Sequence, residues 1–211
     1  MPSLDASEQG LTWVGRPLEV VRVLDSVYLD QARNDFPAYV RGTLAVSQSA
    51  GGRFNPPGEF GALYTAGDEA TAWEEVAARF RRQGVRNLPP DMGVIGILIT
   101  VGRFADLADE PTRGLWEISE AALTSSDPSP DERDACWALS RAVRAVADFL
   151  QSPSARADGV NIPLYADREN GDLRMEMQFA VRREVPADLR QTAQESWLEA
   201  SGVDLVGAGR E

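Results

Sequence analysis

The chain has 211 residues, a length typical of one domain, and 43% hydrophobic residues are enough to bury a full core. Its net charge of -12 disfavours direct nucleic-acid binding, because neutralising phosphates requires a basic surface. The sequence has no histidine, no lysine and only one cysteine, Cys136. These absences exclude Ser-His-Asp and Cys-His catalysis, Schiff-base lysines and the Walker lysine, and they disfavour a zinc site. Carboxylates, arginines, tyrosines and hydroxyls remain for any chemistry.

The sequence also predicts where the protein acts. No apolar run approaches the roughly 20 residues that a membrane helix needs. The segment Met1–Gly10 lacks the cationic start of a signal peptide, and a single cysteine cannot form an intramolecular disulfide. We therefore expect a cytoplasmic protein that does not associate with membranes and holds no metal.

Three segments are expected in chain order: an N-terminal arm over 1–17, a folded domain over 18–185, and a C-terminal helix and tail over 186–211. Strand-like runs are Glu19–Leu24, Gly61–Thr65 and Val94–Val101, with mixed structure over 25–50. Residues 107–130 are expected to be mostly loop around a short helix at 115–123. A helix is expected over 131–150, a hairpin over 160–181 that turns at 170–172, and a last helix over 187–200.

These elements do not alternate regularly between strand and helix. This order favours an α+β fold over a doubly wound sheet. Cys136 lies on the apolar face of the helix over 131–150, so its predicted role is core packing.

The helix expected over Glu69–Gln83 begins at the N-cap Asp68 and stops before Gly84. Its apolar stripe leaves Glu74 and Glu75 at equal angles, about 130° from the centre of the stripe, so helical periodicity cannot choose between them. Four arginines follow towards its end, and we interpret them as a solvated helix end: Arg79, Arg81, Arg82 and Arg86.

An unusual segment, Gly-Gly-Arg-Phe-Asn-Pro-Pro-Gly over 51–58, precedes this helix. Two flexible glycines and a rigid Pro-Pro turn let the backbone approach a ligand while fixing one arginine. Tyr64 follows Arg53 by eleven residues, and Glu75 follows Tyr64 by another eleven. Each residue alone is typical of ordinary surface or packing, but together the loop, strand and helix predict one cleft.

Cleavage of the nicotinamide glycosidic bond of NAD+ suits such a site. Nicotinamide leaves as a neutral molecule, so no general acid is required, and a carboxylate stabilises the oxocarbenium-like transition state. Arginine forks bind diphosphate, and an aromatic ring can stack on nicotinamide.

The block Gly-Gly-Arg-Phe-Asn-Pro-Pro-Gly, then Ala-Leu-Tyr-Thr-Ala, then Ala-Thr-Ala-Trp-Glu-Glu-Val resembles the RES domain family. These are toxins of bacterial toxin–antitoxin pairs, and their fold is related to that of the ADP-ribosyltransferases. The resemblance implies a split, mixed or antiparallel β-sheet core with flanking helices. It implies catalytic roles for Arg53, Tyr64 and Glu75, and it selects Glu75 over Glu74. It also implies NAD+ binding by four residues: Arg22, Arg53, Asn55 and Tyr64.

The family's serine is expected at the position of Leu164, while Ser152 and Ser154 lie upstream. The resemblance implies degradation of NAD+ by hydrolysis or phosphorolysis, and neutralisation by an Xre-type helix-turn-helix antitoxin that blocks the cleft. The alternatives are mono-ADP-ribosyl transfer to a protein, and an impaired RES-fold module that binds a nucleotide or a partner. A homodimer is also left open.

Overall fold

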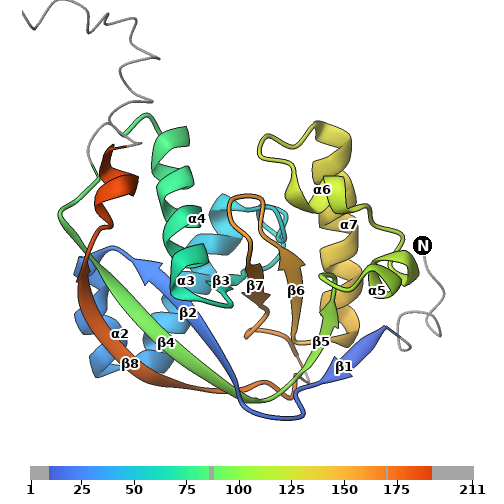
Figure 1. Ribbon diagram of the computed structural model, residues 1–211. Helices are drawn as coiled ribbons and strands as arrows, with labels where there is room; N and C mark the ends of the chain where they lie inside the picture. Colours follow the sequence, from blue (N-terminus) through green and yellow to red (C-terminus); the bar gives the residue numbers. More distant parts are fainter. Residues whose placement is uncertain (1–9, 86–87, 170, 192–211) are drawn as a thin grey trace, which may run out of the picture.

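The computed structural model describes residues 10–85, 88–169 and 171–191, and Figure 1 shows one mixed sheet with helices on both faces. The strands are β1 Leu11–Trp13, β2 Leu18–Leu24, β3 Leu63–Ala66, β4 Asp91–Val101, β5 Arg103–Asp106, β6 Phe149–Pro153, β7 Val160–Leu164 and β8 Arg174–Glu184. The helices are the 3-10 turn η1 Ser26–Tyr28 and α2 Leu29–Asn34, α3 Phe36–Ala50, α4 Glu69–Arg82, α5 Glu110–Leu115, α6 Glu120–Thr124 and α7 Pro130–Val146. The expected α+β class is confirmed.

The eight strands form a single sheet in the order β1-β5-β6-β7-β3-β2-β4-β8. Every neighbouring pair is antiparallel except β5 and β6, which are parallel. The pairing of β2 with β4 is continuous over seven residues, from Leu18 to Leu24. The pairing of β2 with β3 consists of one residue pair, Val21 with Ala66. The sheet is therefore split between β2 and β3.

Side chains alternate across this sheet and feed cores on its two faces. One face carries Val20, Leu24 and the isoleucines of β4 against α2 and α3. The opposite face has two cores: Trp73 and Ala77 of α4 pack against Val23 and Val94, and α6 and α7 pack over β5 and β6. In Figure 1, α4 and α7 stand apart on this face, with β3, β6 and β7 between them.

The local signals of α4 act as predicted. The side chain of Asp68 accepts a hydrogen bond from the Thr71 amide, and Gly84, at φ 67°, follows the C-cap Gln83. The core position of Cys136 is also confirmed, since its side chain is completely buried and its Sγ lies 3.4 Å from the Ala122 carbonyl oxygen.

Three expectations for the second half of the chain are wrong. The hairpin over 160–181 does not form, because β7 pairs with β3 and β6 whereas β8 pairs with β4. The buried Asp148 carboxylate binds Arg168 and the Asp172 amide, and so anchors the connection that leads β8 away from β7. The helix expected over 131–150 ends at Val146, and its last predicted residues begin β6. Two short helices, α5 and α6, replace the single one expected over 115–123.

The ends of the domain also differ from expectation. Residues 25–50 are mostly helical, and the expected arm contains β1, which pairs with β5. A helix begins at Ala187 as predicted, but its expected course beyond residue 191 lies outside the described residues. No helix in the part of the chain described here is long and apolar enough to cross a membrane.

Candidate active site

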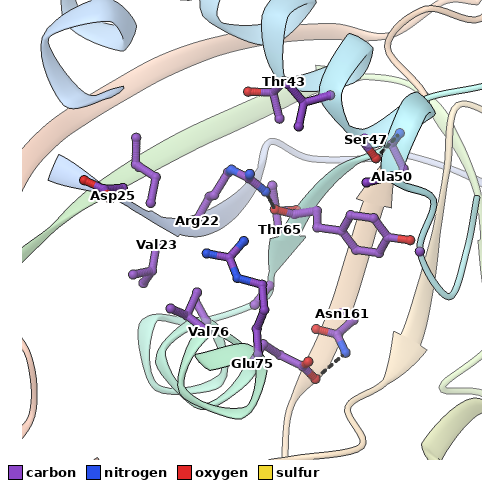
Figure 2. A pocket seen from close by; sticks show the side chains of 18 of the residues that line it. Arg22, Val23, Asp25, Thr43, Ser47, Ala50, Thr65, Glu75, Val76 and Asn161 are labelled. Carbon is purple, nitrogen blue, oxygen red and sulfur yellow. Dashed lines mark hydrogen bonds between the residues drawn. The ribbon is translucent and has the colours of Figure 1, made fainter. Parts of the chain in front are cut away.

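A cavity of about 820 Å³ opens where β2 and β3 separate. Its walls come from β2, α3, the Gly51–Phe54 segment, β3, α4 and the loop that joins β6 to β7. Figure 2 shows Arg22 and Thr65 between Thr43 on one side and Glu75 with Asn161 on the other. The structure therefore brings the predicted residues Arg22, Arg53, Tyr64 and Glu75 to one cavity.

Glu75 is the acidic residue that α4 presents to this cavity. Its Oε1 accepts hydrogen bonds from the Ser154 hydroxyl and the Asn161 side-chain amide, both at 2.7 Å (Figure 2 shows the second). Its Oε2 has no hydrogen-bond partner among the described residues. Glu74 lies outside the cavity and pairs with Arg81 at 3.5 Å. Tertiary structure thus separates two carboxylates that helical periodicity could not.

The two donors to Glu75 meet because β6 and β7 are neighbouring antiparallel strands. Ser154 follows the end of β6 and Asn161 lies at the start of β7. Gly159 lets their loop rest on the first turn of α4, because a Cβ there would collide with the Thr71 hydroxyl. The Arg156 amide donates to Ser154 Oγ at 3.0 Å, which leaves the hydroxyl proton directed at Glu75.

The expected serine position at Leu164 is wrong. Leu164 is completely buried, pairs with Leu63 and Phe149, and does not line the cavity. Ser154, ten residues earlier, is the serine that contacts the carboxylate. The expected position relied on a hairpin of β7 with β8. In the structure β7 pairs with β6 and β3, and the loop between β6 and β7 carries the serine that reaches Glu75.

The Gly51–Gly58 loop and Tyr64 form the opposite wall through hydrogen bonds to each other. The Tyr64 hydroxyl donates to Asn55 Oδ1 at 2.8 Å and accepts from the Phe54 amide at 2.9 Å. Gly52 is required here, because a Cβ would lie 2.5 Å from the Tyr64 oxygen. Burial is the main cause of a raised pKa of Tyr64. The hydrogen bond from the Phe54 amide acts in the opposite direction and lowers this pKa. The hydroxyl therefore stays protonated and structural, while Tyr64 still lines the cavity.

Asn55 does not occupy the position expected of a ligand-binding residue. It is completely buried and absent from the cavity wall. Its side-chain nitrogen donates to the Ser47 and Phe60 carbonyl oxygens, at 2.8 and 3.2 Å. The structure therefore does not place Asn55 where it could contact a ligand in the cavity, and its amide instead holds the loop in shape.

Arg53 and Arg22 line the cavity but are tied to the protein. The Arg53 guanidinium donates from both terminal nitrogens to carbonyl oxygens at the end of α6, those of Leu123 and Ser125. Arg22 donates to the Tyr39 hydroxyl at 2.9 Å and to the Tyr64 carbonyl oxygen at 2.5 Å. The second bond crosses the split between β2 and β3, where the ladder of the sheet is interrupted.

Three further arginines on the cavity wall were missed by the sequence analysis: Arg79, Arg82 and Arg156. Arg79 and Arg82 were interpreted as part of a solvated helix end; both are exposed to solvent near the end of α4, and both also line the cavity. Their spacing from Glu75, four and seven residues, places all three on one helix face and was a usable signal. Arg156 lies in a loop, and no sequence pattern marks it. Arg86 lies outside the described residues.

The sequence model of the RES domain matches residues 20–190. The chain therefore belongs to the RES domain family. Among solved structures it is similar to a chain in the "Crystal structure of the M.tuberculosis MbcT-MbcA toxin-antitoxin complex", with a TM-score of 0.65 and 16% sequence identity over 90% of this chain and 96% of that one. At this identity the likeness establishes the shared fold. No curated protein matches the chain.

Proposed function

We propose that this RES domain is an NAD+-degrading toxin that cleaves the N-glycosidic bond to nicotinamide. The observation that carries the proposal is the Glu75 carboxylate, fixed through Oε1 by two hydrogen bonds and open to the cavity through Oε2. Membership of the RES family and the arginine-rich walls support it.

The reaction needs only the groups that this chain has. The bond between C1′ of the ribose and the pyridinium nitrogen breaks, and its electron pair leaves with nicotinamide, which becomes neutral. Glu75 Oε2 stabilises the positive charge that develops at C1′ and the ring oxygen. Water then forms the new bond to C1′ and gives its proton to solvent. Phosphate in place of water gives phosphorolysis.

NAD+ loss with purified protein tests this proposal. We expect Glu75→Gln to lower the rate by about 10²–10³-fold, as is typical for losing one transition-state charge contact. Glu74→Gln is the matched control: it neutralises the adjacent carboxylate outside the cavity, and its rate should stay near that of the wild type. Equal rates in wild type and Glu75→Gln, or no NAD+ consumption by wild type freed of any partner, would contradict the proposal.

Mono-ADP-ribosyl transfer shares this bond cleavage and differs in the acceptor. NAD+ labelled on its adenylate part separates the outcomes: free labelled ADP-ribose or its phosphate supports degradation, and label on a protein supports transfer. The third alternative, an impaired binding module, rested on Leu164. The contact of Ser154 with Glu75 argues against that reason, because a serine is then available at the site without a residue change at position 164. Calorimetric NAD+ binding without turnover would restore it.

We also propose that a cognate antitoxin, of the Xre helix-turn-helix type that the family resemblance implies, neutralises this chain. The structural neighbour was crystallised in a toxin–antitoxin complex. Co-expression with a helix-turn-helix frame adjacent to the gene should abolish NAD+ loss in cells. Undiminished loss in the presence of the bound partner would contradict neutralisation.

A further inference from the structure

The cavity face of α4 carries two arginines that differ from the other cavity arginines in their partners. Arg53, Arg22 and Arg156 each donate to a carbonyl oxygen of the protein. Within the described residues, neither the Arg79 nor the Arg82 side chain has a hydrogen bond or an ion pair; the Arg79 guanidinium lies over the neighbouring Phe80 ring, 5.5 Å from its centroid. Both remain exposed to solvent within the open cavity.

Helical geometry places these two arginines in line with Glu75. The spacings i, i+4 and i+7 share one face, and the rise per residue separates Arg79 and Arg82 from Glu75 by about 6 and about 10 Å along the helix. Arg81, between them in sequence, is directed away and pairs with Glu74. One helix therefore presents a carboxylate and two unpaired guanidinium groups to the same cavity.

Positive charges gather in the part of the cavity beside Arg79 and Arg82, although the chain is acidic overall. Partial desolvation lowers the pKa of Arg79, and the nearby charges of Arg22 and Arg82 lower it further, whereas the Asp25 carboxylate, which also lines the cavity, raises it. Desolvation followed by the charge of Arg82 acts in the same direction on Arg156. Asp25 and Glu75 offset this effect only in part, since the pKa of both arginines stays lowered. Arginine remains protonated despite such shifts, so the remaining repulsion favours the binding of an anion.

We propose that Arg79 and Arg82 form the anion site of the cavity and hold the diphosphate of a dinucleotide whose glycosidic carbon faces Glu75. A guanidinium with free terminal nitrogens can bind two phosphate oxygens at once. In a dinucleotide, one ribose and one phosphoester linkage separate the glycosidic carbon from the first phosphorus. This short separation suits binding of the glycosidic carbon at Glu75 and of the diphosphate at the neighbouring arginines of the same helix. The Arg53 guanidinium is already hydrogen-bonded to the end of α6, so it holds the cavity wall in place and does not bind the anion.

The dinucleotide in this assignment rests on the proposed function, whereas anion binding does not. Calorimetry with inorganic pyrophosphate therefore tests the site without turnover. We expect Arg79→Gln and Arg82→Gln each to weaken pyrophosphate binding about tenfold, and the double variant about a hundredfold. Arg81→Gln is the matched control, because it removes an equal charge from the same helix turn outside the cavity. Its affinity should stay near that of the wild type, and unchanged melting temperatures would confirm folding.

Kinetics with NAD+ supply a second measurement. The double variant should raise KM with little change in kcat, because the diphosphate is bound in both the ground and the transition state. Unchanged pyrophosphate affinity in the double variant, equal weakening by Arg81→Gln, or no pyrophosphate binding by wild type would overturn the site. Pyrophosphate binding that follows the expected pattern without NAD+ loss would support the site and contradict only the proposed function.

Discussion

The Gly51–Gly58 loop, through Gly51–Phe54, lines the same cavity as Tyr64 and the cavity face of α4, but the polar side chains of the loop and of α4 have different partners. In the first region the side chains of Arg53, Asn55 and Tyr64 all bind other parts of the protein. On α4, Glu75 has one free oxygen, and Arg79 and Arg82 have no polar partner among the described residues. The first region is a rigid wall, and the second is free to bind a ligand. The polar residues of a family motif can thus serve mainly to shape the site.

Asn55→Ala should have the largest effect on the wall region. It removes three hydrogen bonds and leaves the carbonyl oxygens of Ser47 and of the buried Phe60 without their side-chain donor. We expect the free energy of unfolding to fall by about 2–4 kcal/mol, measured by urea denaturation. A loss below about 0.5 kcal/mol would mean that the loop does not depend on this amide.

Tyr64→Phe distinguishes the role of the ring from that of the hydroxyl, because it removes the hydroxyl and keeps the ring. The change leaves Asn55 Oδ1 and the Phe54 amide without a partner, so we expect a loss of about 1–3 kcal/mol in stability. The ring remains, so the rate of NAD+ loss by folded protein should change by less than about threefold, or about 0.7 kcal/mol. A rate loss of a hundredfold in folded protein would instead give the hydroxyl a catalytic role, consistent with the catalytic role that the family resemblance implies for Tyr64.

Asn161→Ala should have a smaller effect, and it should act on activity. Asn161 is a positioning residue: its amide holds Glu75 Oε1, and Ser154 supplies a second donor that remains. We expect about a tenfold lower kcat with little change in KM, a transition-state loss of about 1.4 kcal/mol. Restoration of kcat by Asn161→Gln is not expected, since the longer side chain misplaces its amide. An equal rise in KM would indicate a role in substrate binding instead.

Several features could be predicted from the sequence because they depend on neighbouring residues. Asp68 and Gly84 determined where α4 begins and ends, since capping is local to the chain. The absence of histidine and lysine limited the available chemistry, and the spacing of Arg53, Tyr64 and Glu75 indicated one cleft. The α+β class also followed from the order of the elements.

Other features were decided only by contacts between distant parts of the chain. Helical periodicity left Glu74 and Glu75 equivalent, and the resemblance to the RES family selected Glu75. The structure gives the physical reason, because the β6–β7 connection brings Ser154 and Asn161 to Glu75. The pairing of β7 with β6 brought Ser154 to Glu75 and buried Leu164, and strand pairing is non-local. The sequence by itself supplied the residue types of the site, and the tertiary structure decided which of them remain free to bind a ligand.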